Sequence, residues 1–498
     1  MGNENGKEEA QRMAETIDAW LGNPISRRII KFCTKRCHTC GRRIDNILKD
    51  YIGCKQEMCM ACKTANFIVS NVLDSMISRS PISKEEVIIS LKDPVWRKGL
   101  ASVLEGIARY GVEKPFTGSA PFLVVWNITR ACNLNCKHCY EDAHVAGPDE
   151  LTPQRRLEAV DTMADAGIAY IAISGGEPLV LPDFFDVAKR IIDNEMGFSI
   201  ATNATLLTKE KAKQLKNHNC IFVQVSLDGA TAKTHNSFRG RSAFQKTIRG
   251  IKNAVAEDIA VGISATVTQF NYKEVPAIIN LSEKLGARVF MHYNFIPTGR
   301  GKEIVNMDIS PQQREELLVA MAKQAGKRKI TLLSTAPQYG RICMATSAGM
   351  VSLTHFDTFG QTAEADNIKF LADFIGGCGT GRLYCALEPN GDIEPCVFIP
   401  IKIGNIMHDN IVELWHDSEV LKQLREREHF KGHCGVCENR NVCGGCRARA
   451  YGYYGDLSQC DPGCMNNLDA WNELKGINQT MSKEHQAVSK VRAGVHSK

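Results

Sequence analysis

The sequence has no long hydrophobic run. Among its 498 residues, no uninterrupted apolar stretch approaches the roughly 18 to 20 residues that a membrane-spanning helix needs. The first ten residues, MGNENGKEEA, lack the apolar core of a secretory signal. The net charge of +6 is mild, so it indicates no particular partner and does not predict nucleic-acid binding. We therefore expect a soluble globular protein of the cytoplasm, large enough for two or three domains.

Cysteine, by contrast, is abundant. The chain has 20 cysteines. Only Cys220 and Cys343 stand alone, and we interpret these two as small buried apolar side chains. The other cysteines lie in closely spaced clusters, which is typical of metal ligands rather than of disulfides in a secreted protein.

Strand and helix patterns alternate from about residue 120 to residue 310. The apolar runs predict strands at 122–128, 169–174, 198–201, 221–227, 261–267 and 289–294. Helical spacing between them, for example in 154–166 and 183–194, indicates six βα units. Six units are too few for a closed eight-stranded barrel. In folds of this kind the active site lies at the carboxyl ends of the strands.

Chemically distinctive residues follow the first two predicted strands. Cys132, Cys136 and Cys139 stand in the run ACNLNCKHCY after the first strand. Gly175-Gly176-Glu177-Pro178 follows the second strand. A [4Fe–4S] cube has four irons, so three thiolates leave one iron with open coordination positions for a small molecule.

The CxxxCxxC run and the later GGEP resemble the radical S-adenosylmethionine (SAM) superfamily. The resemblance implies an α/β fold with a partial (β/α)6 TIM-like barrel and one [4Fe–4S] cluster whose open iron binds SAM. One electron then splits SAM into methionine and a 5'-deoxyadenosyl radical, which abstracts hydrogen from a substrate. An electron donor, a ferredoxin or a flavodoxin, is implied as a partner.

The resemblance also implies how neighbouring residues bind SAM. Gly175-Gly176 would let the backbone come close to SAM, and Glu177 with nearby carbonyls would accept hydrogen bonds from its ammonium group. Ser226 is expected to bind the ribose hydroxyls, and Arg239 the methionine carboxylate. Tyr140 is expected to pack on the adenine.

A second group of cysteines lies after residue 375. The segments PNGDIEPC, CENRNVCGGC and DPGC resemble the SPASM extension of radical SAM enzymes, which holds two auxiliary [4Fe–4S] clusters. Carried over position by position, the ligands of the first cluster are Cys378, Cys385, Cys396 and Cys446. Those of the second are Cys434, Cys437, Cys443 and Cys464. Cys460 competes with Cys464 as the last ligand, and two zinc sites are the alternative to the clusters.

The substrate is less sharply indicated than the cofactor. The segment GGCGTGRLYCALEPNGDIEPCVF is most similar to the branch of haem-biosynthesis radical SAM proteins, with peptide maturases next. Anaerobic sulfatase-maturing enzymes carry an aspartate after the cysteine equivalent to Cys396, where this chain has Val397. Oxidation of serine or cysteine to formylglycine, which needs that base, is therefore not expected. The two similarities leave a tetrapyrrole or a peptide as the expected substrate. The alternatives are a lipid-modifying radical SAM enzyme and a non-enzymatic iron–sulfur electron carrier.

The first 115 residues lie outside the resemblance and have a metal-like pattern of their own. Cys33, Cys37 and Cys40 repeat the CxxxCxxC spacing, but no GGEP follows. The pairs Cys37/Cys40 and Cys59/Cys62, eighteen residues apart, have the spacing of a structural zinc site. A further iron–sulfur cluster would use the same residues.

These patterns predict five segments. They are a Cys-rich helical metal-binding module (1–115), the radical SAM core (116–310), a bridging segment (311–375), the SPASM domain (376–470) and a disordered tail (471–498). Amphipathic stripes within 68–77 and 96–107 predict helices in the first segment. We expect these helices to pack on each other or on the barrel rather than on a membrane surface.

Overall fold

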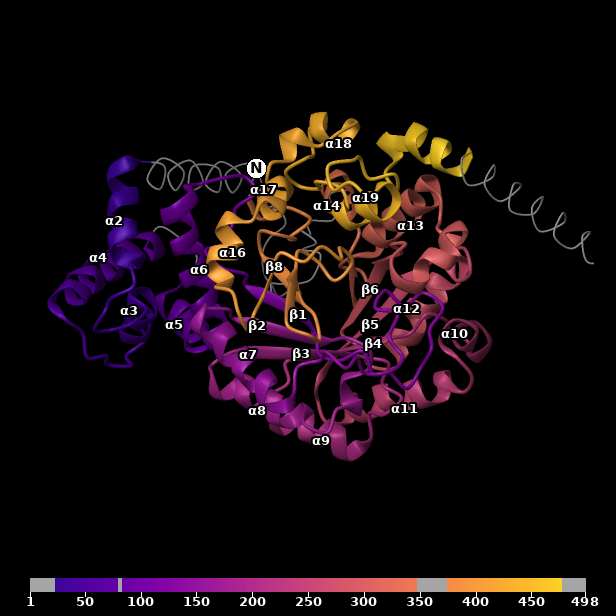
Figure 1. Ribbon diagram of the computed structural model, residues 1–498, viewed down its shortest axis with the longest axis horizontal. Helices are drawn as coiled ribbons and strands as arrows, with labels where there is room; N and C mark the ends of the chain where they lie inside the picture. The colour runs from indigo at the N-terminus through magenta and orange to yellow at the C-terminus, as the bar shows by residue number, and fades with distance from the viewer. Residues whose placement is uncertain (1–22, 79–82, 347–373, 477–498) are drawn as a thin grey trace, which may run out of the picture.

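The structure, a computed structural model, describes residues 23–78, 83–346 and 374–476. Helices at the N-terminal end lie to one side of a central sheet, which other helices surround, and the C-terminal segment covers the top of the sheet in the view of Figure 1.

The centre is a ten-stranded sheet in the order β10-β9-β8-β1-β2-β3-β4-β5-β6-β7. Its strands are β1 (Leu123–Asn127), β2 (Tyr170–Ser174), β3 (Gly197–Thr202), β4 (Phe222–Ser226), β5 (Ala260–Val267), β6 (Val289–Asn294), β7 (Thr331–Ser334), β8 (Tyr384–Leu387), β9 (Asp392–Glu394) and β10 (Gly404–Asn405). Every pair from β8 to β7 is parallel, whereas β9 and β10 pair antiparallel. Because β10 and β7 are not neighbours in this order, the barrel is open.

Helices connect the parallel strands and pack on the outer face of the sheet. They are α7 (Pro153–Asp165), α8 (Phe184–Asp193), α9 (Lys209–Asn217), α10 (Ala232–Arg239), α11 (Ala243–Ala256), α12 (Val275–Lys284), α13 (Pro311–Gln324) and α14 (Gln338–Ala345), with the short helices η1 (Pro178–Val180), η2 (Tyr272–Glu274) and η3 (Gly299–Met307). Their starts follow ordinary capping rules. In α7, for example, the side chain of Thr152 accepts a hydrogen bond from the N–H of Arg155, and a proline occupies the first turn.

The predicted fold class is confirmed: each strand expected between residues 122 and 294 is present, as β1 to β6. The sheet is nevertheless wider than the six predicted units. β7 lies in the segment 311–375, which we expected only to bridge two domains, and β8 comes from the predicted SPASM domain. Both strands have four residues, too short for a periodic pattern, and each pairs with an edge that the first six strands leave free. The limits of the five segments stay a prediction.

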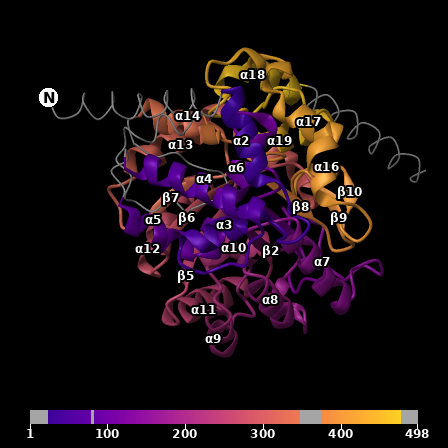
Figure 2. The same cartoon turned by 90° about the vertical axis from the view of Figure 1, so that its left-hand side faces the viewer.

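The N-terminal module, residues 23–78 and 83–110, consists of five helices. They are α2 (Pro24–Thr34), α3 (Arg43–Tyr51), α4 (Met60–Ile77), α5 (Lys84–Lys92) and α6 (Pro94–Tyr110). The predicted stripes pack inward, with Val69, Leu73 and Leu104 against buried Ile44 and Leu48. Figure 2 shows this module in front of the barrel. In the described residues, no helix combines the length and the apolar character that crossing a membrane requires.

Polar contacts at both ends of α6 join this helix to its surroundings. The Nζ of Lys98 donates to the carbonyl of Asn194, which follows α8, at 2.9 Å. At the other end of α6, the hydroxyl of Tyr110 lies 2.5 Å from Nδ1 of His416 in the C-terminal segment. The module is therefore attached to both the barrel and the C-terminal segment.

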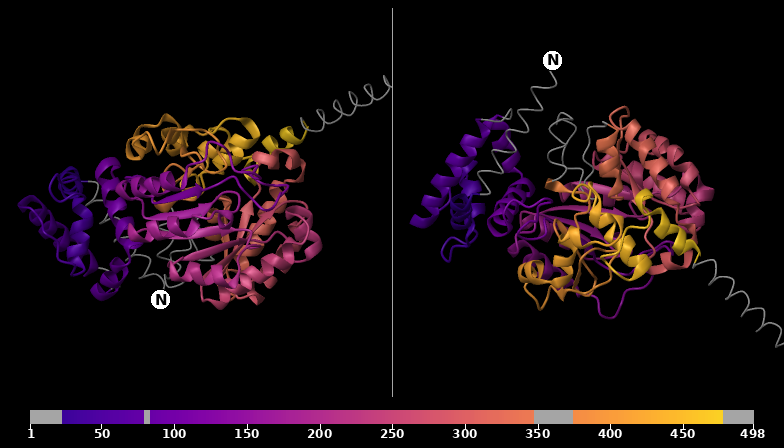
Figure 3. Two further views of the ribbon diagram at one scale, coloured as in Figure 1. Left: turned by 60° about the horizontal axis from the view of Figure 1, so that its bottom comes forward. Right: turned by 90° about the horizontal axis from the view of Figure 1, so that it is seen from above.

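The C-terminal segment runs along one side of the sheet, as both views of Figure 3 show. Its helices are α16 (Ile411–Asp417), α17 (Glu419–Arg425), η4 (Arg427–His429), α18 (His433–Val436), α19 (Arg447–Tyr454) and η5 (Met465–Asn467). A further helix covers residues 468–476, and its last six residues fall within the segment predicted as a tail. Trp471 is buried there and contacts the ring of Tyr453 at 6.2 Å between centroids. Residues 477–498 lie outside the described residues.

Candidate active site

A cavity of about 390 Å³ opens inside the barrel. Its walls run along the strands, from Leu123 and Tyr170 at the strand starts to the loops beyond their carboxyl ends. The predicted residues that line it are Cys132, Cys136, Cys139, Tyr140, Gly175, Gly176, Ser226 and Arg239. The structure thus brings together four segments that are far apart in the sequence.

The three cysteines stand in the loop after β1, and protein groups already surround their sulfur atoms. The N–H of Leu134 donates to Sγ of Cys132 at 3.5 Å, and that of Ala143 donates to Sγ of Cys139 at 3.4 Å. Burial raises the pKa of the Cys132 thiol to about 12. A metal that binds the thiolate would therefore displace a proton. Three thiols facing one cavity fit a [4Fe–4S] cluster with one open iron.

Gly175 and Gly176 allow the loop after β2 to pack directly on the backbone that leads into the cysteine loop. A Cβ on Gly175 would lie 2.6 Å from the carbonyl oxygen of Thr129, and one on Gly176 would lie 2.2 Å from that of Ala131. The N–H of Gly176 donates to the Thr129 carbonyl at 2.7 Å. Any side chain at either position would separate the two loops.

Glu177 follows the two glycines but does not itself line the cavity. It is fully buried, and its carboxylate is hydrogen-bonded at the end of β3. It accepts hydrogen bonds from the hydroxyl of Thr202 at 2.7 Å and from the N–H groups of Asn203 and Leu179 at 2.9 and 3.2 Å. Because these donors already surround the carboxylate, Glu177 fixes the glycine loop to the neighbouring strand and leaves ligand contacts to the backbone.

Ser226 and Arg239 face the cavity from the end of β4 and from α10. The Nε of Arg239 donates to Oδ2 of Asp228 at 2.5 Å, and its Nη1 lies 3.8 Å from Sγ of Cys136. Burial opposes ionisation of Asp228, but the Arg239 guanidinium, His138, His235 and the N–H of Thr266 together outweigh it and hold the pKa of this carboxyl below its usual value. A fixed positive charge therefore lies beside the cysteine loop.

Tyr140 directly follows the third cysteine and lies at the cavity wall. Its hydroxyl donates to Oδ1 of Asn127 at 3.0 Å and lies 2.9 Å from Oγ of Ser174. Its ring contacts that of Phe398 at 4.8 Å between centroids. These contacts hold an aromatic face at the cavity, as the predicted packing on adenine requires.

Three of the four cysteines predicted for the first auxiliary cluster lie around Tyr384 of β8. The Tyr384 hydroxyl donates to Sγ of Cys396 at 3.2 Å. Burial raises the pKa of Tyr384, and the nearby thiols of Cys396, Cys378 and Cys446 raise it further. These three cysteines come from three separate loops, so the fold supplies a second grouping of thiols.

Cys385 is the exception and corrects the predicted ligand set. Side chains alternate along a strand, so Cys385 and Tyr384 face opposite sides of β8. Tyr384 lies beside Leu123 and lines the cavity, whereas Cys385 lies beside Val124 in the apolar core. The described residues therefore place three thiols near Tyr384, whereas burial alone, and no neighbouring thiol, raises the pKa of Cys385.

The cysteines predicted for the second auxiliary cluster also converge. Burial raises the pKa of Cys443, and the nearby thiols of Cys464 and Cys434 contribute to the rise. Cys437 directly follows α18, the helix that contains Cys434, and no contact between its thiol and the other three is observed in the described residues. The thiol of Cys460 likewise lies close enough to Cys434 to be affected by it, so the choice between Cys460 and Cys464 stays open.

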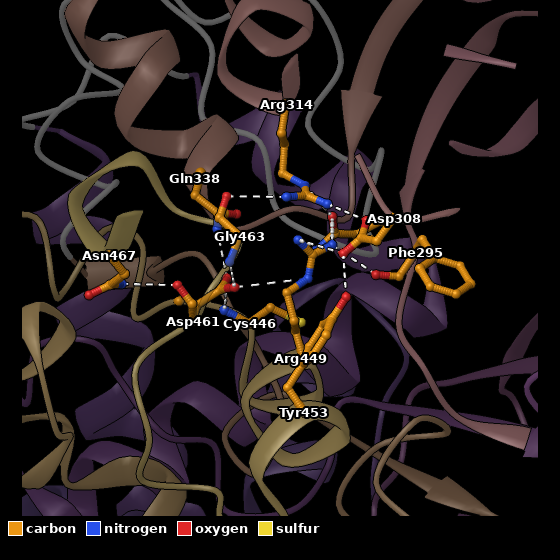
Figure 4. Close-up of polar contacts among 12 residues, drawn as sticks. Phe295, Asp308, Arg314, Gln338, Cys446, Arg449, Tyr453, Asp461, Gly463 and Asn467 are labelled. Carbon is orange, nitrogen blue, oxygen red and sulfur yellow. Dashed lines mark hydrogen bonds and ion pairs between the residues drawn. The ribbon is translucent and has the colours of Figure 1, made fainter. Parts of the chain in front are cut away.

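Asp461 connects the two auxiliary groups of cysteines. Its Oδ2 accepts hydrogen bonds from the N–H of Cys446 at 2.8 Å and from Nε2 of Gln338 at 2.6 Å. Its own N–H donates to Sγ of Cys434 at 3.4 Å. Asp461 thus contacts a residue of each group, Cys446 through its carboxylate and Cys434 through its backbone N–H; Figure 4 shows the contacts to Cys446 and Gln338.

Arg449 of α19 attaches this cysteine-rich segment to the barrel. It is fully buried, and its Nη2 donates to the carbonyl of Phe295 at 2.8 Å (Figure 4). The same nitrogen contacts Oδ1 of Asn294, the last residue of β6. Its Nη1 lies 3.9 Å from the carboxylate of Asp308. These contacts fix the position of the auxiliary cysteines relative to the cavity.

Sequence reasoning missed several residues that shape the site. Arg300 donates from Nε to the carbonyl of Cys136, and its N–H donates to that of Cys139, both at 2.9 Å. His138 is packed between Asp228 and Arg239. Asp228 follows the fourth predicted strand in the run Ser226-Leu227-Asp228-Gly229, which was the available signal. Arg300 lies on a different loop and matched no motif.

Cys37, Cys40, Cys59 and Cys62 do not line the cavity. They lie in the N-terminal module, where their four sulfur atoms are within 4.8 Å of one another. Cys33 is buried beside Ala65, and Cys54 is exposed.

Two protein-family models match the chain in the regions described above. The model of the radical SAM superfamily matches residues 126–281, which include the three cavity cysteines and the glycine loop. The model of an iron–sulfur cluster-binding domain, SPASM, matches residues 378–447.

Curated relatives and solved structures agree with these matches. The chain is 35% identical to an AdoMet-dependent heme synthase of Methanosarcina barkeri over 356 residues, which are 70% of this chain and 97% of that protein. It is 29% identical to the mycofactocin maturase MftC of Mycobacterium ulcerans, over 70% of this chain and 89% of that one. Its fold is similar to that of Streptococcus suis SuiB bound to precursor peptide SuiA, with a TM-score of 0.57 at 15% identity over 81% and 90% of the two chains.

The two matched domains imply SAM and [4Fe–4S] clusters as cofactors, and the relatives are synthases and maturases. The chain therefore belongs to the radical SAM superfamily and is an enzyme of that superfamily with a SPASM iron–sulfur domain.

Proposed function

We propose that Cys132, Cys136 and Cys139 bind the catalytic [4Fe–4S] cluster and that SAM occupies the cavity beside them. The observation that carries this proposal is that these cysteines line one cavity with Gly175 and Gly176. Bound together, the cluster and SAM supply a 5'-deoxyadenosyl radical that abstracts hydrogen from a substrate. The protein itself would bind and orient SAM and the substrate and exclude water from them.

Different protein groups around the cavity would bind different parts of SAM. The carbonyl groups of the glycine loop, held in place by Glu177, accept hydrogen bonds from an ammonium group. Arg239 presents a guanidinium that is already oriented by Asp228, which suits a carboxylate. Ser226 is placed to bind a ribose hydroxyl, and the ring of Tyr140 gives a flat apolar surface for adenine.

The cysteines of the SPASM domain would bind two auxiliary [4Fe–4S] clusters, which would transfer single electrons. Cys378, Cys396 and Cys446 hold the first. Cys434, Cys437 and Cys443 hold the second, together with Cys464 or Cys460. We also propose that the enzyme is an oxidoreductase of the cytoplasm that receives electrons from a ferredoxin or a flavodoxin.

A tetrapyrrole is the substrate class that we favour. The support is the 35% identity to a protein named heme synthase, against 29% to a protein named as a peptide maturase. The cavity wall also contains aromatic rings, those of Tyr293, Phe295 and Phe398, which suit packing against a flat macrocycle. A peptide is the second candidate, on the likeness to the maturase.

The test starts from the full chain, reconstituted with iron and sulfide without oxygen. With SAM and a strong reductant, we expect 5'-deoxyadenosine, and we expect its rate of formation to rise when a carboxylated tetrapyrrole is added. Cys136→Ala should form none, whereas Cys54→Ala, a change at an exposed cysteine outside every site, should match the unaltered chain. Equal product from Cys136→Ala would refute the cluster assignment. Stimulation by a peptide alone would refute the tetrapyrrole.

A further inference from the structure

Four cysteines of the N-terminal module meet in space although they come from two segments. Cys37 and Cys40 lie in the loop before α3, Cys59 directly precedes α4, and Cys62 lies in its first turn. All four Sγ atoms are within 4.8 Å of one another, and those of Cys37 and Cys59 are 3.7 Å apart. The four thiols therefore surround a single point.

The separation of the sulfur atoms distinguishes between the two metals that the sequence left open. A zinc ion with tetrahedral Zn–S bonds of about 2.3 Å keeps its sulfur ligands about 3.8 Å apart. A [4Fe–4S] cube needs wider spacing, because each thiolate binds a different iron and points outward from a different corner. The observed separations match one ion and are too small for a cube.

The backbone around these cysteines explains how the sequence builds such a site. Cys37 and Gly41 form an antiparallel bridge, with N–H to carbonyl distances of 2.8 and 3.0 Å in the two directions. Gly41 adopts a φ of +73°, which a residue with a side chain rarely takes. The tight turn places Cys37 and Cys40 on the same side, and the N–H of Cys59 donates to Sγ of Cys40 at 3.3 Å.

Nearby positive charge suits a site of four thiolates. Cys59 and Cys62 lie at the N-terminal end of α4, where the partial positive charge of a helix stabilises anions. The guanidinium of Arg43, itself buried, lies close enough to Cys62 and Cys37 that these two groups raise its pKa against the effect of burial. A zinc ion with four thiolates carries a net charge of −2, which these groups partly offset.

We infer that Cys37, Cys40, Cys59 and Cys62 bind one structural Zn²⁺ ion. Four protein ligands complete the coordination of the ion and leave no position for a substrate. The ion joins the loop before α3 to the start of α4. The buried apolar clusters around it are small, for example Cys33, Ile47 and Ala65, and small cores commonly need a metal to be stable. The site lies outside both matched family domains.

The experiment measures zinc, iron and acid-labile sulfide in the full chain purified without oxygen. We expect about one zinc per chain, in addition to the iron of the clusters. Cys59→Ser and Cys62→Ser should each lose this zinc and keep the iron and sulfide, whereas Cys54→Ser should keep all three. Loss of iron and sulfide instead of zinc would overturn the inference, and so would unchanged zinc in both variants.

A second measurement needs no variant and so does not depend on whether the altered chains fold. X-ray absorption at the zinc edge of the unaltered full chain should show four sulfur neighbours at about 2.3 Å. Nitrogen or oxygen in place of any sulfur would contradict the four-cysteine site. Neither measurement depends on SAM cleavage. The zinc site can therefore be refuted while the proposed function stands, and the proposed function can be refuted while the zinc site stands.

Discussion

The N-terminal helices and the barrel both contain cysteines with the spacing CxxxCxxC, within 33–40 and within 132–139. In the barrel all three cysteines line one cavity. In the helical module the first cysteine, Cys33, is buried beside Ala65, and Cys59 and Cys62 of another segment complete a group of four with Cys37 and Cys40. The same spacing thus produces an open group of three thiols in one place and a closed group of four in the other.

The difference teaches that spacing determines which sulfur atoms can be neighbours, whereas the fold determines how many thiols surround the metal. A loop at the carboxyl end of a barrel strand faces a cavity, so coordination positions stay free for a ligand. A loop packed against the start of a second helix meets further thiols, and the coordination of a metal is completed.

The largest expected effect comes from removing the first cysteine of each run. Cys132→Ala should abolish 5'-deoxyadenosine formation, because a cluster cannot be held on two thiolates with its fourth iron free for SAM. Cys33→Ala should keep nearly all activity and lose only about 1 kcal/mol of unfolding free energy, the amount for deleting one buried small group. Product analysis and denaturant unfolding check the two outcomes. Equal loss of activity in both variants would mean that the runs are equivalent.

A smaller effect is expected within the SPASM domain, where Cys396 contacts the hydroxyl of Tyr384 and Cys385 lies on the opposite face of β8. Cys396→Ala should reduce bound iron by about four atoms per chain, the content of one cluster. Cys385→Ala should keep all of it, because Cys385 lies on the face of β8 opposite to Tyr384, beside Val124. Iron analysis and electron paramagnetic resonance of the reduced full chain provide the measurement. If Cys385→Ala loses the same iron, strand alternation is the wrong guide to these ligands.

The smallest expected effect concerns the attachment of the N-terminal module to the barrel. Burial lowers the pKa of Lys98 to about 8, below its value in the unfolded chain. Between these two values the unfolded chain binds more protons, so stability should rise with pH. We expect a gain on the order of 1 kcal/mol between about pH 7 and about pH 9. Denaturant unfolding of the full chain should show that Lys98→Met lacks this increment. If the unfolding free energy of Lys98→Met rises with pH as steeply as that of the unaltered chain, the prediction is wrong.

Much of the barrel could be predicted because its signals are local. The predicted strand 289–294 coincides with a strand of the same bounds, β6 (Val289–Asn294), because its three leading apolar residues, Val289, Phe290 and Met291, form consecutive buried positions on both faces. β7 and β8 could not be predicted, because four residues carry too little pattern. The roles of Glu177 and Cys385 were also out of reach, since each depends on the direction in which one side chain points.

The sequence by itself determined the superfamily, the cofactors and the alternation of strands and helices, because these depend on residue types at fixed short spacings. Only the tertiary structure decided that Cys33 is core and Cys59 part of the four-thiol group, that Tyr384 rather than Cys385 faces the auxiliary thiols, and that Arg449 joins the two domains. The physical reason is that the number and direction of groups around a metal depend on contacts between distant segments, which no local pattern records.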